Sequence, residues 1–377
     1  MDFELIEEQR ILQKTAQDFL KKECPKELVR NLDESEDGYS PELWKKMAEL
    51  GWMGLIIPEA YGGSEWSFLD LVILLEEMGY NICPGPFFPT TILGGLTVLK
   101  AGNEEQKNEV LPSVCSGDMI LTLAMTEAEG GVEPVSIQTK AEQQGEAFIL
   151  SGTKLFVPDA HLAHKILIVA RTSENQDPAQ GLTVFLADAG VDGMTINPLK
   201  SIARDKQCEV VLDGVRLPAG SILGTKDQGW MVINEIMVYA AIARAAEIIG
   251  GARAAMDLAF DYAKERTQFG RPIGSFQAMQ HYLADMWVEI YGARNLVYQA
   301  AWKLSEGLPA HMEAAMAKGR AGLVGRKATI TAHRIFGAIS FTMEHDLHLY
   351  TRRALAGDMA LGDADFQHEK VAECIGL

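Results

Sequence analysis

The chain has 377 residues, with 34 basic and 52 acidic side chains and a formal net charge of -18 at pH 7. This length exceeds what one simple hydrophobic core requires, so we expect about two to three domains. The acidic surplus argues against nucleic acid as a partner and opposes binding to an anionic membrane. An anionic ligand would have to bind at a local group of basic side chains.

The cysteines are scattered along the chain and form no Cys-x-x-Cys pair. This pattern argues against a zinc site and against a disulfide framework, and it indicates a reducing, cytoplasmic location. Residues 1–8 are acidic and amphipathic, unlike a signal sequence or an arginine-rich transit peptide. No apolar run is long enough to span a bilayer, so we expect no membrane segment. The five cysteines are Cys24, Cys83, Cys115, Cys208 and Cys374.

The first third of the chain has apolar residues at the three-to-four spacing of helices with one buried face. Asn103 precedes the last of these helices and is a typical N-cap residue. The acidic run at 33–37 favours a solvated loop. We therefore predict an N-terminal α-helical domain over residues 1–117. The expected helices cover residues 3–24, 41–50, 67–78, 92–101 and 104–114.

At about Asp118 the pattern changes to short alternating runs rich in β-branched and aromatic residues. Turns containing Gly, Asn and Asp separate these runs, and Asp205-Lys206 is a further expected turn. This pattern indicates a small antiparallel barrel or sandwich, and we predict a middle antiparallel β-barrel domain over residues 118–226. The expected strands cover residues 119–126, 147–151, 154–157, 166–170 and 182–186.

Helical periodicity then returns and continues through the rest of the sequence, with helices of thirty or so residues. Helices of this length and spacing favour an up-down bundle. We predict a C-terminal four-helix bundle domain over residues 227–377, which makes the whole chain α+β. The expected helices cover residues 230–264, 275–306, 310–336, 346–360 and 363–375.

The stretch 265–277 separates the first two of these helices. Gly270 and Gly274 permit a sharp reversal, Pro272 prevents the helix from continuing, and Ser275 is the expected N-cap of the next helix. One interpretation is a solvated helix corner. The other is a site for a flat, phosphate-bearing ligand, because the stretch gathers a cation, two amides and an aromatic ring. Those four residues are Arg266, Gln268, Phe269 and Gln277.

Further motifs occur in a fixed order along the chain. They are Pro-Glu-Ala-Tyr-Gly-Gly at 58–63, Ala-Met-Thr-Glu at 124–127, Gly-Thr-Lys-Leu-Phe-Val at 152–157, Arg-x-Gln-Phe-Gly-x-Pro-Ile at 266–273 with Phe-Gln at 276–277, His281 with Ala-Asp-Met at 284–286, and the tail at 341–350. With this order and the three expected domains, the chain resembles the acyl-CoA dehydrogenase family of flavoproteins over essentially its whole length. The tail is similar to a bacterial branch.

The resemblance implies FAD as cofactor and acyl-CoA as substrate. In this family a carboxylate removes a proton from the α-carbon, a hydride passes from the β-carbon to the flavin, and an electron-transferring flavoprotein accepts the electrons. It also implies a tetramer in which a neighbour's tail completes each FAD site, here a homotetramer or a heterotetramer with a related chain. The residues that it implies for cofactor binding are Met125, Thr126, Phe156, Pro158, Arg266, Gln268, Phe269, Gln277, Arg334 and Gly337.

Two of these positions carry specific expectations. Arg266 is a planar, permanently charged donor suited to the FAD pyrophosphate. Phe156 stands where the family usually has a Trp against the flavin ring, and the alternative interpretation is a core strand residue. We expect Val132 and Arg244 to contact the substrate.

The sequence also departs from the family pattern. A usual Gly-Ser-Asp element is replaced by Ala-Glu-Gly-Gly-Val-Glu at 128–133. Pro158 offers neither a hydroxyl nor an N–H where the family commonly has Thr or Ser. In the glycine-rich element of the tail, Ala338 and Ser340 replace two glycines, and their Cβ atoms hinder close approach of the backbone to a ligand.

The catalytic carboxylate is the largest departure, because the two usual positions fall at Leu361 and Ala240 and neither can take a proton. Glu247 is the best remaining candidate, about two turns from Ala240 on the same helical face. Burial would raise its pKa toward a useful base. The alternative is an ion pair with Arg244 at i-3. Weaker candidates are Glu127, Asp363 and Asp365.

Three functions remain open at this stage. The first is FAD-dependent dehydrogenation of an acyl-CoA whose acyl chain is not simple and straight but branched, cyclic or otherwise non-standard. The second is a non-catalytic or half-catalytic structural subunit of an α2β2 complex. The third is a flavin monooxygenase on the same fold. We expect no metal site, because the close-set ligands at 344–348 fit a helix start better.

Overall fold

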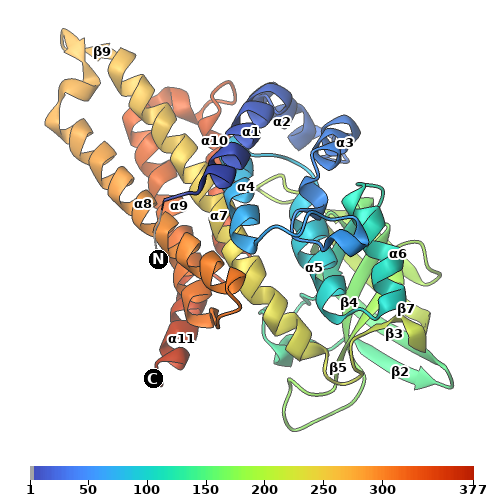
Figure 1. Ribbon diagram of the computed structural model, residues 1–377. Coiled ribbons are helices and arrows are strands. Elements are labelled where there is room, and N and C mark those ends of the chain that lie inside the picture. Colours follow the sequence, from blue (N-terminus) through green and yellow to red (C-terminus); the bar gives the residue numbers. More distant parts are fainter. Residues whose placement is uncertain (1–3) are drawn as a thin grey trace. The chain divides into compact units, whose positions relative to one another are not determined.

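The computed structural model describes residues 4–377 (Figure 1). Its residues group into two compact units. The first contains the described residues up to Asn31, Ser67–Cys83 and Ala241–Leu377, and the second contains Leu32–Trp66 and Pro84–Ala240. Along the sequence, helices come first, then a sheet, then helices again, as predicted. The boundaries predicted at 117 and 226 remain predictions, because the two units combine segments from different parts of the sequence.

The first unit is helical. In it α9 contacts α8, α10 and α11, while α4 contacts both α1 and α8. Five α-helices follow residue 227, as many as the five expected ranges, and the predicted four-helix bundle is not confirmed. The helices are α1 (Glu7–Glu23), α4 (Phe68–Asn81), α7 (Gly229–Glu265, in this unit from Ala241), α8 (Gln277–Ser305), α9 (His311–Phe336), α10 (Leu347–Met359) and α11 (Ala364–Cys374).

Small residues bring these helices close together. A Cβ added at Gly325 of α9 would lie 2.5 Å from a methyl carbon of Ile248 in α7. Gly79 of α4 lies against the backbone of Glu247, where an added Cβ would be 2.1 Å from the carbonyl oxygen. Because real side chains do not approach so closely, both crossings require glycine.

The second unit is built around an eight-stranded sheet in the order β6-β7-β3-β2-β4-β5-β8, with β1 pairing in parallel with β4. The sheet domain is present as predicted, but the sheet is not closed, so the predicted antiparallel barrel is not confirmed. Closure would pair β6 with β8, and β8 has only two residues. The strands are β1 (Leu121–Ala124), β2 (Lys140–Gln144), β3 (Ala147–Pro158), β4 (Lys165–Arg171), β5 (Leu182–Asp188), β6 (Met194–Leu199), β7 (Gln207–Pro218) and β8 (Ile222–Leu223).

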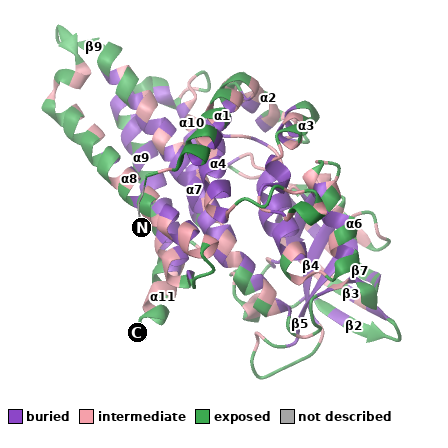
Figure 2. Ribbon diagram, in the orientation of Figure 1, coloured by how far each residue is buried: buried purple, intermediate pink, exposed green. Residues whose placement is uncertain are grey.

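The core of the sheet is apolar and aromatic. Phe148 and Phe185 are both buried, with ring centroids 5.3 Å apart, and Ile166, Ile168 and Val210 belong to the same cluster. The inner strands β4 and β5 are correspondingly buried along their length (Figure 2). The helices of this unit are α3 (Pro41–Glu49), α5 (Leu96–Ala101) and α6 (Glu104–Cys115), with a π-helical segment at Pro89–Gly95 before α5.

Of the two predicted N-cap residues, one is confirmed and the other is wrong. Asn103 caps α6 as predicted, accepting the backbone N–H of Gln106 at 2.9 Å. Ser275 is not the cap of α8, because α8 begins after Phe276 and the Ser275 hydroxyl donates to the carbonyl of Pro272. A helix that was not predicted, α2 (Lys26–Glu34), includes the first part of the acidic run, and Asp33 is buried.

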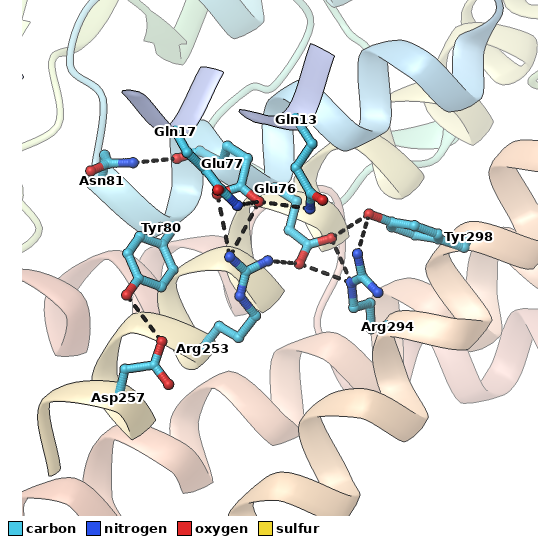
Figure 3. A network of polar contacts seen from close by, with 10 residues as sticks. All are labelled: Gln13, Gln17, Glu76, Glu77, Tyr80, Asn81, Arg253, Asp257, Arg294 and Tyr298. Carbon is cyan, nitrogen blue, oxygen red and sulfur yellow. Dashed lines mark hydrogen bonds and ion pairs between the residues drawn. The ribbon is translucent and has the colours of Figure 1, made fainter. Parts of the chain in front are cut away.

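A buried carboxylate joins α4, α7 and α8 within the first unit (Figure 3). The side chain of Glu76 is 1% exposed and accepts hydrogen bonds from Arg294 Nε at 2.8 Å and the Tyr298 hydroxyl at 2.7 Å, and it pairs with Arg253. Burial alone would raise the pKa of Glu76, but the guanidinium groups of Arg294 and Arg253 and the Tyr298 hydroxyl outweigh it and lower that pKa. Glu76 is therefore ionised in the folded protein.

The neighbouring carboxylate extends this network to α1. Glu77 accepts from Gln13 at 2.9 Å and from Gln17 at 3.1 Å, and Arg253 Nη2 lies 3.2 Å away. Tyr80 donates to Asp257 at 3.0 Å (Figure 3). Four helices thus share one connected polar network.

Replacing Glu76 by Gln should destabilise the chain by about 3–5 kcal/mol, because Arg253 and Arg294 would lose the charge that compensates them. Thermal and denaturant unfolding measure this loss. Since the pKa of Glu76 is lower in the folded state, its contribution should be present above its unfolded pKa and disappear as the pH falls through its folded pKa.

The matched control is Glu42→Gln, which removes a surface i,i+4 pair with Lys46. It should change the unfolding free energy by about 0.5 kcal/mol or less. Equal effects of the two variants would contradict the structural role given to Glu76.

Candidate functional site

The corner between α7 and α8 is a tight hairpin within the first unit. Thr267–Gln268 (β9) pairs with Arg271–Pro272 (β10) in antiparallel fashion. The two turn residues have positive φ, 54° at Phe269 and 79° at Gly270, as a type I′ turn requires. The reversal is therefore made by the backbone of the motif itself.

The side chains at this corner point into solvent. Phe269 is 92% exposed, although a bulky residue rarely adopts its positive φ. Its ring meets that of Phe276 edge to face at 6.2 Å, and the Arg271 guanidinium lies 4.1 Å from the Phe276 ring centre. Arg266, Gln268 and Gln277 are also exposed, so all four predicted corner residues are open to solvent.

An apolar groove lies between α7 and α8 beside this corner. Its volume is about 710 Å³, within the range of small-molecule sites. Phe260, Leu283 and Trp287 line it together with Pro272 and Gly274 of the corner. Sequence periodicity did not indicate this groove. Periodicity identifies apolar residues, but it does not show which of them stay exposed to solvent in the fold.

The predicted tail residues lie at the end of α9. Arg334 is exposed and lines a small cavity of about 110 Å³ with Asp285 and Lys327. Gly337 ends the helix with a φ of 72°. Ser340 is buried, donates to the Gly337 carbonyl at 2.8 Å and lies 2.8 Å from His333 Nδ1. The serine that replaces a family glycine therefore closes the turn on itself.

The second unit carries the other predicted cofactor residues on β3 and just after β1. Phe156 is 60% exposed with a φ of 54°, so it is not a core strand residue. Thr126 accepts the backbone N–H of Leu155 at 2.8 Å, and the Pro158 carbonyl accepts the Thr122 hydroxyl at 2.6 Å. Met125 is nearly buried, and Val132 is half-buried in the loop that follows.

A buried ion pair supports this segment. Lys154 is 0% exposed, and its Nζ lies 2.5 Å from Glu127 and 3.2 Å from the Met125 carbonyl. Glu127 also accepts the backbone N–H groups of Gln138 and Thr139. Burial lowers the pKa of Lys154 to about 8. A lysine among buried strand residues needs a polar partner, so this pattern could have indicated a buried ion pair from the sequence.

Glu127 is not suited to act as the base. Burial alone would raise its pKa, but the charge of Lys154 and the hydrogen bonds from Lys154 and Thr139 outweigh burial and lower it. Asp363 caps α11 through the Phe366 N–H at 3.0 Å, and Asp365 is exposed. These three weaker candidates therefore have structural or solvent-exposed positions.

Glu247 lies on α7 with its side chain 22% exposed. Its Oε2 lies 2.6 Å from Arg244 Nη1, so the ion pair considered as an alternative is present. Burial nevertheless raises the pKa of Glu247, while Arg244 and Arg353 oppose the rise. The result is a carboxylate that holds a proton more readily than an ordinary glutamate.

The two usual family positions for the base are apolar in the structure as well. Ala240 is fully buried. Leu361 has a φ of 61° in the turn between α10 and α11. Sequence reasoning missed Lys318, which is buried and donates to the Asp358 carbonyl at 2.8 Å and the Gly362 carbonyl at 3.0 Å. Burial lowers the pKa of Lys318 to about 8, and its two bonds fix the turn around Leu361.

Among residues 4–377, no group of three or more metal-ligating side chains could hold an ion. In the tail, His345 Nδ1 accepts the Leu347 N–H at 3.1 Å and His348 Nε2 lies 3.3 Å from the Met343 carbonyl. Over the same part of the chain, no helix has the length and apolarity needed to cross a bilayer.

Comparison with known proteins identifies the family of the chain. Residues 6–118, 122–215 and 227–376 match the N-terminal, middle and C-terminal domains of acyl-CoA dehydrogenases. The chain is 32% identical to a probable acyl-CoA dehydrogenase of Bacillus subtilis (strain 168), covering 99% of each. It therefore belongs to the acyl-CoA dehydrogenase family.

Solved structures agree with this assignment. The ChsE4-ChsE5 complex from Mycobacterium tuberculosis has a chain 28% identical, with a TM-score of 0.91, covering 100% of this chain and 99% of that one. PigA with FAD and proline is 25% identical, with a TM-score of 0.93 and complete coverage of both chains.

The Lys154-Glu127 pair gives a direct test of what supports the 125–127 segment. Lys154→Met should destabilise the chain by about 3–5 kcal/mol, because it leaves a buried carboxylate without its cation. Adding Glu127→Gln should recover part of this loss, because the amide oxygen can still accept the N–H groups of Gln138 and Thr139. Thermal unfolding of the single and double variants measures both effects, and no recovery in the double variant would contradict the pairing.

Proposed function

We propose that this chain is a FAD-dependent acyl-CoA dehydrogenase that oxidises an acyl-CoA thioester to the 2-enoyl-CoA and passes electrons to an electron-transferring flavoprotein. Membership of the family supports the reaction class. The observation that carries the proposal is Glu247, a half-buried carboxylate with a raised pKa on the helix where the family can place its base. We also assign it to the cytoplasm, as a homotetramer or a heterotetramer with a related chain.

The residues present fit FAD. Phe156 and Phe269 keep exposed aromatic rings on backbone with positive φ, a costly arrangement that is concentrated at ligand-binding positions. Arg266 is an exposed cation for the pyrophosphate, and Gln268 and Gln277 supply neutral donors beside it. When bound, FAD supplies a hydride acceptor.

Met125, Thr126, Phe156 and Pro158 are the residues of the second unit that we assign to the flavin ring. Lys154 holds the backbone of this segment through the Met125 carbonyl. Arg334 and Gly337 remain assigned to a cofactor, although Ser340 fixes their turn internally.

Glu247 is the residue that we assign to proton removal from the substrate α-carbon. Arg244, paired with it at 2.6 Å, orients the carboxylate and keeps part of it ionised. We assign Arg244 and Val132 to the substrate as well. A base displaced from both usual positions requires a substrate whose α-carbon lies elsewhere, which favours a branched, cyclic or otherwise non-standard acyl group.

The first test is spectroscopic. Purified protein should show flavin absorbance that bleaches when the correct acyl-CoA is added anaerobically. Glu247→Gln should retain the flavin, and its rate of flavin bleaching should fall by a factor of about 100 or more, because an amide cannot accept the proton. Arg266→Ala should instead lose flavin.

Asp365→Asn is the matched control, because it removes an exposed carboxylate of the same domain, and it should behave like the parent chain. Undiminished bleaching in Glu247→Gln would exclude Glu247 as the base. A colourless protein that cannot be reconstituted with FAD would exclude the proposal.

The pH dependence gives a second test. Because Glu247 must be deprotonated to act, kcat/KM should rise with pH, with a midpoint above the ordinary glutamate range. Arg244→Gln should move this midpoint to higher pH, because it removes a positive charge that favours the ionised carboxylate. A midpoint unchanged by Arg244→Gln would show that another group controls the profile.

A second candidate function is a subunit of a heteromeric dehydrogenase that is inactive alone. Leu361 and Ala240 at the usual base positions, together with the self-closed turn at Ser340, favour it. The similar ChsE4-ChsE5 structure is itself a complex, which is consistent with this candidate function. Full activity of this chain expressed alone, with one FAD per subunit, would exclude it.

A further inference from the structure

Two cysteines far apart in the sequence meet where two helices of the first unit end. Helices α1 and α4 run side by side in the same direction, since Gln9 donates to Asp70 at 2.9 Å and Gln17 to Glu77 at 3.1 Å. Their C-terminal ends therefore lie together. Cys24 caps α1, and Cys83 lies two residues beyond the end of α4.

The two side chains lie within hydrogen-bonding reach of each other, since a side-chain hydrogen bond between them shifts the pKa of both thiols. A second bond joins the same two segments, because Lys26 Nζ donates to the Asn81 carbonyl at 2.8 Å. The Cys83 N–H donates to the Met78 carbonyl at 2.9 Å, which holds the end of α4 in place. The pair is thus held by backbone and side-chain bonds on both sides.

The surroundings favour a thiolate at one member of the pair. The hydrogen bond from Cys83 lowers the pKa of Cys24. Burial opposes this shift, and the positive charge of Lys26 lowers the pKa further. The same hydrogen bond, burial and the charges of Cys24 and Glu247 raise the pKa of Cys83 well above its ordinary value. A thiolate in contact with a second thiol is the arrangement that disulfide formation needs.

A small reagent can reach the pair only from the side of Cys83. Cys24 is 1% exposed, while Cys83 is partly exposed. Burial raises the pKa of Cys115 to about 11 and raises that of Cys208, so those two thiols are poor nucleophiles. Cys374 is exposed near the C-terminus.

We propose that Cys24 and Cys83 form a redox modification site, in which a hydroperoxide converts the two thiols into an intramolecular disulfide. The S–S bond forms as the O–O bond of the hydroperoxide breaks. The two sulfurs lose one electron pair to the peroxide oxygens, and the two thiol protons leave with those oxygens as water and an alcohol, or as two waters from hydrogen peroxide. A dithiol reductant reverses the change by exchange.

The site borders the residue assigned as base. Glu247 is close enough for its charge to affect Cys83, and Gly79 in the last turns of α4 packs on the Glu247 backbone. A disulfide would tie the end of α1 to the end of α4 and restrict this turn. The proposal itself concerns the thiols and does not depend on the dehydrogenase reaction.

The experiment uses the full chain, with whatever cofactor it retains, carrying Cys374→Ser to prevent links between molecules. After treatment with hydrogen peroxide and alkylation of free thiols, a non-reducing peptide map should show Cys24 joined to Cys83. The intact mass should fall by two hydrogen atoms, and two of the four remaining thiols should become unreactive. A dithiol reductant should restore both. The melting temperature should rise on oxidation, because the bond closes a loop of about 60 residues.

Cys83→Ser should abolish the cross-link, and Cys115→Ser, the matched control, should leave it intact. The peptide map of the chain with native Cys24 and Cys83 decides the matter even if a variant folds poorly. The proposal is overturned if both thiols stay alkylatable after peroxide has oxidised the exposed Cys374 of the unsubstituted chain. It is also overturned if Cys83 is oxidised to a sulfinic acid while Cys24 remains free.

Discussion

The ionised carboxylate of Glu76 is the constraint on which the first unit depends. It takes bonds from α7 through Arg253 and from α8 through Arg294 and Tyr298, while α4 supplies the carboxylate itself. A buried charge tolerates few alternative arrangements, so this contact fixes the register of the three helices as well as their proximity. The close crossing at Gly79 belongs to the same contact between α4 and α7, and it brings α4 against the backbone of Glu247.

The same principle recurs in the second unit, where the more deeply buried member of the pair is the cation. Lys154 lies on strand β3, and the carboxylate of Glu127 reaches it from the loop that follows β1. Because Glu127 also binds the N–H groups of Gln138 and Thr139, one ion pair shapes both ends of that loop. In the second unit the exposed Phe156 therefore lies two residues from Lys154, a strand position that a buried ion pair holds in place.

Sequence reasoning located the long helices well, because thirty residues of periodic pattern leave little ambiguity, and it located the Asn103 cap because capping is local. It failed where the outcome depends on distant partners. Helix α2 has only nine residues and runs into the acidic stretch that favoured a solvated loop, so it was not predicted. The open sheet depends on which strands pair with one another, and periodicity does not show this pairing. The ion pair of Glu247 with Arg244 was visible from spacing, whereas the direction of the Glu247 pKa required the actual burial.

In the turn around Leu361, the backbone conformation is set by contacts other than those of the Leu361 side chain. Leucine is a poor choice for a φ of 61°, a conformation that costs about 1–3 kcal/mol, yet the turn forms because Lys318 binds a carbonyl on either side of it. The backbone conformation of the turn is therefore fixed by Lys318 of α9 and does not depend on which side chain stands at position 361. A protein built this way can exchange the reactive group at that position, or do without one, while the surrounding main chain stays as it was.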